Sequence, residues 1–404
     1  MSAFSENDSV FMPVPVMGTH GTIANFQEVT GVSLGSPGTH AWTQGSPLYS
    51  QVPNGPSLDI NITFKFEDLK YPGVSGELIL RNAIKDYYNH FYGSNIDADN
   101  ITVFPGGRSA IQSTLSLLRK ELPILVEETE YTPYWDLFNL MGKTHKIIPS
   151  NFDNNFRPSI TDYTDIAKDL TSHFVLKSNP NNPTGVVCRD EAMQDLVEFC
   201  SKPHCGGLID EAYEFITSPQ VSAMQHIPDI NDTNLFVVGG ATKGLQAPGL
   251  RIGWVVSSKI NANLFKNFSC SGIGGTSNTN QLCCAKMLDI PRVTMARDAM
   301  SAYYADQRVR YGEVLTALGC KLYTGDGAFY HWLLLPFGLS ATEFNERLFK
   351  CKAAILPGMY CDMHRRGEVG PHAGMIRFSF GPLLRESFEQ DIQILKECIY
   401  PPLK

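Results

Sequence analysis

Short apolar runs alternate with segments of helical spacing through the central part of the chain. In the helical segments apolar residues recur every three or four positions, as at Met193, Leu196 and Val197, which is typical of an amphipathic helix. The intervening runs are short and rich in Val, Ile, Leu and Phe, which is typical of buried strands. These runs lie at residues 101–104, 124–126, 146–148, 174–176, 207–209, 235–238 and 252–256. Such alternation predicts an α/β fold with a doubly wound, mostly parallel sheet.

The pattern changes after residue 256. Helical segments continue to about residue 302, and a long helix is predicted over 300–318. A capping box at Ser340-Ala341-Thr342-Glu343 predicts the start of another helix. Strand-like runs follow at 330–335, 353–356 and 375–380. Strands grouped with helices in this way predict a smaller α+β domain, whereas residues 1–31, rich in Gly, Pro, Ser and Thr, are predicted to be irregular.

Lys243 is the first candidate for chemistry, because it lies in the apolar, glycine-rich stretch 241–253. Burial disfavours an ammonium group and lowers the lysine pKa, and the uncharged amine is the nucleophile that forms a Schiff base. Arg251, eight residues later, can hold a phosphate beside it. Together they predict a site for pyridoxal 5′-phosphate (PLP). The alternative is a solvated loop lysine and a surface arginine.

Two upstream segments support that interpretation. One is an apolar run that breaks into an Asn-Pro-Thr-Gly turn at Asn182, and the other is a strand that delivers Asp210 and Tyr213 to its carboxyl end. Ligands gather at this edge of an open α/β sheet. Asp210 can meet a protonated pyridine nitrogen, while Asn182 and Tyr213 can both donate to a phenolate oxygen. Alone, Asp210 could be a helix cap or half of an ion pair, and Asn182 part of a plain turn.

With these motifs in place, the chain resembles the fold-type I PLP enzymes of the class I/II aminotransferase family from about Val32 to the C-terminus. The motifs that carry the resemblance are Asn182-Pro183-Thr184-Gly185, Asp210-Glu211-Ala212-Tyr213, and Lys243 with Gly249, Arg251 and Gly253. The resemblance implies that the chain moves the amino group of an L-amino acid to a 2-oxo acid through a Schiff base on Lys243. It also implies that Asp210 and Tyr213 complete the catalytic set.

The resemblance implies further contacts with the cofactor. The amides of Gly107 and Arg108, at a predicted helix start, are expected to cradle the phosphate together with Thr242 and Arg251. Tyr131 is expected to stack on the pyridine ring. Tyr71 matches a tyrosine that reaches the phosphate of a neighbouring subunit, which implies a homodimer with shared active sites.

Contacts with the substrate are expected from other positions. Arg377 matches the arginine that binds the α-carboxylate, and Gly35 and Asn182 are expected near the same group; alternatively, Arg377 is a partly exposed strand arginine in a salt bridge. His40 and Trp42 are candidates for contact with the substrate side chain, or else they pack under the small domain. The implied domains are residues 67–300 for the cofactor and 301–404 for the small domain, which residues 1–66 join.

Gly240 departs from the family pattern, in which a serine precedes the Schiff-base lysine by three residues. The departure leaves two alternatives open. The first is a PLP-dependent lyase, cyclase or oxidase that acts on a functionalised amino acid in a specialised natural-product pathway. The second is a PLP-binding sensor without catalysis.

Composition and charge limit the kinds of binding partner and indicate the cellular compartment. The net charge of −8 over 404 residues, with no Lys or Arg before Lys65, argues against nucleic acid and membrane partners. The N-terminal stretch lacks the basic and apolar regions of a signal peptide. The ten cysteines form no CxxC pair, so no metal is expected, and we expect reduced thiols in the cytoplasm.

Overall fold

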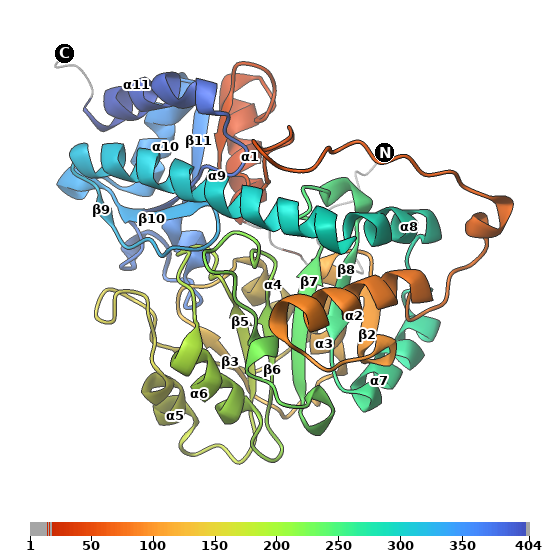
Figure 1. Cartoon of the computed structure of the whole chain (residues 1–404). Helices are drawn as coiled ribbons and strands as arrows, with labels where there is room; N and C mark the ends of the chain where they lie inside the picture. The colour runs from red at the N-terminus through yellow and green to blue at the C-terminus, as the bar shows by residue number, and fades with distance from the viewer. Residues whose placement is uncertain (1–13, 15, 17, 401–404) are drawn as a thin grey trace, which may run out of the picture.

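The computed structural model describes residues 14, 16 and 18–400. The larger of its two parts is built around a seven-stranded sheet (Figure 1). Its strands are β2 (Ile101–Phe104), β3 (Ile124–Glu127), β4 (His145–Ile148), β5 (Phe174–Ser178), β6 (Gly206–Asp210), β7 (Leu235–Gly240) and β8 (Gly253–Val256). They lie in the order β2-β8-β7-β6-β5-β3-β4, and β8 alone runs antiparallel to its neighbours β2 and β7. The predicted doubly wound, mostly parallel sheet is therefore confirmed.

Both faces of this sheet are buried, which explains why its strands read as continuous apolar runs. Successive residues enter opposite cores: Val175 packs in one hydrophobic cluster and Leu176 in the other. One face is covered by α2, α5, α6 and α8, and the other by α3, α4 and α7. These helices are α2 (Leu78–Tyr92), α3 (Gly107–Leu117), α4 (Pro133–Met141), α5 (Ile160–Ala167), α6 (Asp190–Cys200), α7 (Lys259–Ser271) and α8 (Asn278–Met287).

A second sheet of five strands joins the two ends of the chain. Its strands are β1 (His40–Trp42), β9 (Lys321–Leu322), β10 (Tyr330–Leu334), β11 (Ala353–Pro357) and β12 (Met375–Ser379), in the order β1-β11-β12-β10-β9. β1 pairs parallel to β11, so an N-terminal strand extends a sheet built from C-terminal residues. The helices α10 (Ala341–Lys350) and α11 (Phe388–Ile399) accompany it. Ser340 caps α10 by accepting a hydrogen bond from the Glu343 amide, as its capping box predicts.

The prediction that residues 1–31 are irregular is wrong for part of that range, because Gly18–Thr30 forms the helix α1. Its sequence is mostly small and polar, so the helical period is weak. Packing stabilises it instead: the Phe26 ring meets Phe349 of α10 edge-on, with 5.5 Å between ring centroids. Residues 1–13, 15 and 17 lie outside the described part of the chain.

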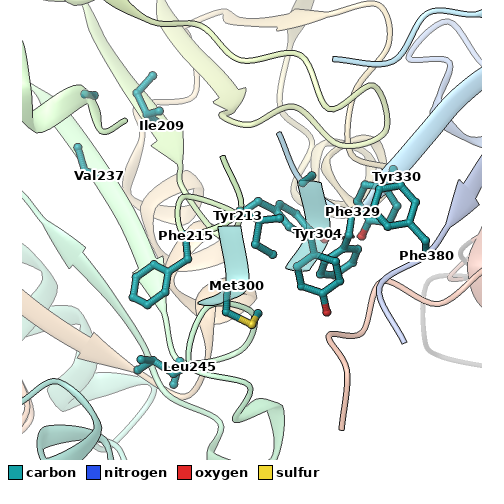
Figure 2. Close-up of a cluster of buried hydrophobic side chains, with 14 of the residues drawn as sticks. Ile209, Tyr213, Phe215, Val237, Leu245, Met300, Tyr304, Phe329, Tyr330 and Phe380 are labelled. Atoms are coloured by element: carbon teal, nitrogen blue, oxygen red, sulfur yellow. Dashed lines mark hydrogen bonds between the residues drawn. The ribbon is translucent and has the colours of Figure 1, made fainter. Parts of the chain in front are cut away.

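Helix α9 (Ile290–Ala317) connects the two sheets and begins ten residues earlier than predicted. Figure 1 shows it running from the large sheet across to the helices of the small one. Beneath it lies an aromatic cluster in which Tyr304 of α9 packs near Tyr213, Phe329 and Tyr330 (Figure 2). This cluster places the carboxyl end of β6 beside the start of β10. The division at residues 66 and 300 stays a prediction, since α9 itself crosses residue 300.

Candidate active site

A cavity of about 450 Å³ opens at the carboxyl ends of β5, β6 and β7, where the two sheets meet. Ser178 and Asp210 reach it from the last positions of β5 and β6, and Thr242 and Lys243 from the loop after β7. Most of the predicted site residues line it. They are Gly107, Arg108, Tyr131, Asn182, Asp210, Tyr213, Thr242, Lys243, Arg251 and Arg377.

Lys243 lines this cavity, is partly buried, and donates a hydrogen bond to the Gly45 carbonyl. Desolvation, together with the positive charges of Arg108 and Arg377, lowers its pKa to about 7, while Asp210 opposes the shift. Its amine lies 5.7 Å from the centre of the Tyr213 ring. A large fraction of this lysine is therefore an uncharged nucleophile at neutral pH.

Asp210 is fixed by two hydrogen bonds at the end of β6. Its Oδ2 accepts from the Tyr134 hydroxyl at 2.9 Å, and its Oδ1 accepts from the Ala212 amide at 3.1 Å. Burial raises its pKa, and both hydrogen bonds act in the opposite direction. A buried carboxylate held by two hydrogen bonds can form an ion pair with a cationic ring nitrogen in the cavity.

Arg377 is buried on β12 and meets no carboxylate within the described part of the chain. It donates to Asn182 Oδ1 and to the Thr43 carbonyl, both at 2.7 Å, and lies over the Tyr330 ring at 4.3 Å. Its Nε has no partner there. The alternative of a partly exposed arginine in a salt bridge does not hold. A buried guanidinium without a counter-charge is costly unless an anion binds it.

Tyr213 lies between this arginine and the lysine. Its hydroxyl is 2.5 Å from that of Tyr330 and 3.4 Å from Asn182 Nδ2. Burial raises its pKa well above the usual value, with Tyr330 adding to the shift, so the hydroxyl keeps its proton and can donate it.

The start of α3 forms the opposite end of the cavity. Gly106 caps this helix with a φ of 96°, which a side chain would strain, and a Cβ there would lie 2.6 Å from an Arg251 nitrogen. The amides of the first turn and the Arg251 guanidinium thus face the same space. Arg108 also donates to the Tyr131 hydroxyl at 2.9 Å. This end of the site fits a phosphate group.

The family model described as "Aminotransferase class I and II" matches residues 60–383. The chain belongs to this family. Members of the family use PLP, and the phosphate end, the buried Asp210 and the low-pKa lysine fit that cofactor. The comparisons give no support to a lyase, cyclase, oxidase or sensor.

Curated aminotransferases show the same similarity at low identity. The chain is 25% identical over 353 residues to a "Probable aspartate/prephenate aminotransferase" of Rickettsia felis, which covers 81% of this chain and 82% of the relative. It is 24% identical over 309 residues to the "LL-diaminopimelate aminotransferase" of Natranaerobius thermophilus, covering 75% and 79%. The fold matches that of the aspartate aminotransferase from Thermus thermophilus with maleate, with a TM-score of 0.80, 20% identity and coverage of 98% and 100%.

Four predicted residues do not line the cavity of this aminotransferase. His40 is buried with its Nδ1 2.6 Å from Asp391, and Trp42 is fully buried against Phe378, so the expectation that they contact the substrate is wrong. They stabilise the small sheet instead. Gly35 lies in an outer turn, where its amide donates to the Thr39 hydroxyl, and does not line the cavity.

Tyr71 is the fourth. It is 98% exposed on the long segment between β1 and α2, away from the cavity. Its contact with a neighbouring subunit therefore stays a prediction.

Several residues that line the cavity are not predicted from the sequence. Gly45 and Ser46 belong to a second Gly-Ser-Pro stretch, ten residues after the one at Gly35, and this second copy lies beside Lys243. The repeated tripeptide is the signal that could have revealed it. Thr19 and His20 enter the cavity from α1, a helix that the sequence did not predict.

The glycine at position 240 has a packing reason. It pairs with Gly253 across β7 and β8, and a Cβ added to it would lie 3.1 Å from the Ile252 carbonyl. A Cβ on Gly253 would in turn meet the Gly107 amide at 2.4 Å. A side chain at position 240 would therefore be tightly packed against the backbone of β8.

A larger cavity of about 600 Å³ lies at the opposite edge of the sheet, beside Phe174, Gly206 and Phe236. Its lining includes one arginine and one glutamate, Arg119 and Glu121, on the surface after α3. It brings together no buried lysine, carboxylate and arginine, so the chemistry belongs to the smaller cavity. Within the described residues no group of His, Cys, Asp and Glu is arranged to hold a metal ion, and no helix is both long and apolar enough to cross a bilayer.

Proposed function

We propose that this protein is a PLP-dependent aminotransferase that transfers the amino group of an L-amino acid to a 2-oxo acid, with the cofactor held at Lys243. One observation carries the proposal: a lysine with a pKa of about 7 and a buried arginine without a counter-charge line one cavity. The first supplies a nucleophile and proton carrier, and the second supplies a site for a substrate carboxylate.

The residues that would hold PLP lie on three sides of the cavity. Its phosphate fits the amides at the start of α3, with Arg251 and Thr242 beside them. Its ring nitrogen fits Asp210, its ring face Tyr131, and its phenolic oxygen Asn182 and Tyr213. When bound, PLP stores the amino group and accepts the electron pair left at the substrate α-carbon.

The other steps belong to side chains of this protein. Arg377 binds the α-carboxylate through parallel hydrogen bonds and so orients the amino acid. Lys243, whose pKa of about 7 lies near neutral pH, would remove the substrate α-proton as a general base and then deliver it to the cofactor as a general acid. Tyr213 keeps its proton and holds the phenolic oxygen in place. The buried aromatic cluster around Tyr330 excludes water from this side of the cavity.

An acidic amino acid is the substrate class that the lining favours. Arg108 pairs with no carboxylate within the described residues, and His20, Gln44 and Thr19 add polar groups to the cavity. The relatives named above act, by their names, on aspartate, prephenate and diaminopimelate. Aspartate and glutamate are therefore the first amino donors to test.

We further propose a homodimer with two shared active sites, located in the cytoplasm. The segment before α2 exposes Phe64, Phe66 and Leu69 together with Tyr71, and such a stretch of apolar side chains is typical of an interface. The cytoplasmic location is supported by the ten free cysteines.

A single-turnover experiment tests the reaction. Purified protein loaded with PLP should be converted by aspartate or glutamate alone to the amine form of the cofactor, in a one-to-one ratio, and added 2-oxo acid should restore the original absorbance. If product accumulates without an acceptor and no amine form is found, the aminotransferase proposal is wrong and a lyase or oxidase replaces it.

A further inference from the structure

Three buried carboxylates lie at the end of β3 and just after it: Glu127, Glu128 and Glu130. Glu127 pairs with Lys177, and Glu128 pairs with Arg366. Glu130 is fully buried, and no lysine or arginine of the described chain pairs with it. A carboxylate in that position is costly unless hydrogen bonds compensate it.

Four donors surround Glu130. Its Oε1 accepts from the Tyr131 amide at 3.0 Å and from the Ser178 hydroxyl. Its Oε2 accepts from Asn181 Nδ2 at 3.0 Å and from the Ser178 amide at 3.3 Å. All four groups donate, so an ionised carboxylate is the form that satisfies every one of them.

The donors connect Glu130 to two walls of the active site, one at Tyr131 and the other at Asn182. Tyr131, whose amide binds Glu130, is the aromatic residue at the ring face. The Ser178 hydroxyl donates to Glu130 and accepts from the Asn182 amide at 3.0 Å. Asn182 in turn accepts from Arg377. The Glu130 carboxylate therefore binds the backbone of Tyr131 directly and the backbone of Asn182 through the Ser178 hydroxyl. In the proposed function, Asn182 links the cofactor to Arg377, which binds the substrate.

We propose that Glu130 is a positioning residue of the active site, which sets the separation and orientation of Tyr131 and Asn182 around the bound cofactor. The proposal rests on the proposed function. Glu130 does not line the cavity, so it acts only through these two residues. Burial raises its pKa to about 8, with the charge of Glu127 adding to the shift, while Lys177 and the hydrogen bonds from the Ser178 hydroxyl and the Tyr131 amide oppose it.

Glu130→Gln is the direct test, because glutamine keeps the shape but replaces one acceptor oxygen with a donor that faces other donors. We expect the affinity for PLP to fall about tenfold and kcat to fall about tenfold to a hundredfold, with a smaller change in KM. The circular dichroism of the bound cofactor, which reports its orientation between the two walls, should weaken. Glu130→Asp, which keeps the charge, should lie between the wild type and Glu130→Gln.

Asp391→Asn is the matched control. Asp391 is fully buried in the small domain and accepts from the Tyr311 hydroxyl at 2.7 Å and the Ser387 hydroxyl at 2.8 Å, but it does not line the cavity and contacts neither wall. Its circular dichroism should remain that of the wild type. Ser178→Ala removes the hydroxyl that donates to Glu130 and accepts from the Asn182 amide, leaves the Tyr131 amide and Asn181 bonded to Glu130, and should reproduce part of the Glu130→Gln effect.

The outcomes separate this proposal from the proposed function. If Glu130→Gln fails to fold, the Ser178→Ala and Glu130→Asp variants decide the question by the same readouts. Wild-type cofactor dichroism and kcat in the folded variants would overturn the positioning role while leaving the aminotransferase intact. A wild-type protein that binds no PLP would overturn both.

Discussion

The state of single ionisable groups decides the chemistry of this site. Three arginines around a buried lysine make its ammonium form unfavourable, and Asp210 is the only carboxylate among the causes that oppose them. The sequence predicts the nucleophile and the Asp210 partner because each lies in a local motif. It does not reveal Tyr134, whose contact with Asp210 joins α4 to β6 across the fold.

The pKa of Lys243 yields the first prediction. Capture of PLP by the cofactor-free protein needs the uncharged amine, whose fraction rises with pH through the folded pKa of about 7. The capture rate should therefore rise between about pH 6 and 8 and then level off, whereas an ordinary lysine would give a midpoint near pH 10.4. Stopped-flow absorbance gives the rate, and Lys243→Ala should show no covalent capture after borohydride reduction. A midpoint above pH 9 would contradict a buried amine.

Tyr134→Phe yields the second prediction at this scale. The Tyr134 hydroxyl lowers the pKa of Asp210, so its loss should raise that pKa further and weaken the ion pair with the ring nitrogen. We expect kcat to fall about tenfold, less than for Asp210→Ala, because one hydrogen bond to a charged group is lost. Tyr311→Phe removes a comparable bond to Asp391 in the small domain, and its kcat should stay unchanged. Equal effects of the two variants in steady-state assays would argue against this role of Tyr134.

At the scale of elements, the spacing of apolar residues and the length of the apolar runs predict those helices and strands whose pattern is set by local sequence. Every predicted strand of the large sheet is present, because both faces are buried and the apolar runs are continuous. Helix α1 was missed because its stability comes from packing on α10 rather than from its own pattern.

Repeated tripeptides show why the site could be predicted only in part. Gly-Ser-Pro occurs at 35–37 and 45–47, and Gly-Thr-His at 18–20 and 38–40. The cavity contains residues of the second copy of one and the first copy of the other. The copies are alike locally, and only the pairing of β1 with β11 and the packing of α1 decide which copy faces the cavity.

The two histidines of these copies give a crossed prediction. His20→Ala should change kcat/KM for acidic substrates severalfold or more and leave the melting temperature unchanged, since His20 is exposed at the cavity. His40→Ala should leave kcat/KM unchanged but cost about 1–3 kcal/mol of unfolding free energy, because the Oδ1 atom of the buried Asp391 carboxylate loses its His40 partner. Steady-state kinetics and urea unfolding of both variants check the pair. The reverse assignment would show that His40, not His20, serves the substrate.

For the whole molecule, the two sheets act as one unit through α9 and the aromatic cluster of Tyr213, Tyr304 and Tyr330 (Figure 2). The same cluster includes Tyr213, which lines the cavity, so packing between the sheets also positions the proposed active site. The segment before α2 contacts α8 but leaves Phe66, Leu69 and Tyr71 exposed. The proposed partner subunit would cover these side chains, and such a contact cannot be predicted from the contacts within one chain.

Subunit mixing tests the shared site. If Tyr71 serves the neighbour's phosphate, a Lys243→Ala chain still supplies an intact Tyr71, and a Tyr71→Ala chain still supplies an intact Lys243. Their mixed dimer then contains one complete site, so random exchange should restore about a quarter of the wild-type sites. Activity above that of either parent, with exchange confirmed by native mass spectrometry, is the expected result.

The matched control mixes Lys243→Ala with Arg377→Ala, because both residues line the same cavity of one chain and no complete site can form. Recovery in the control but not in the Tyr71 mixture would mean that Arg377, rather than Tyr71, crosses the interface.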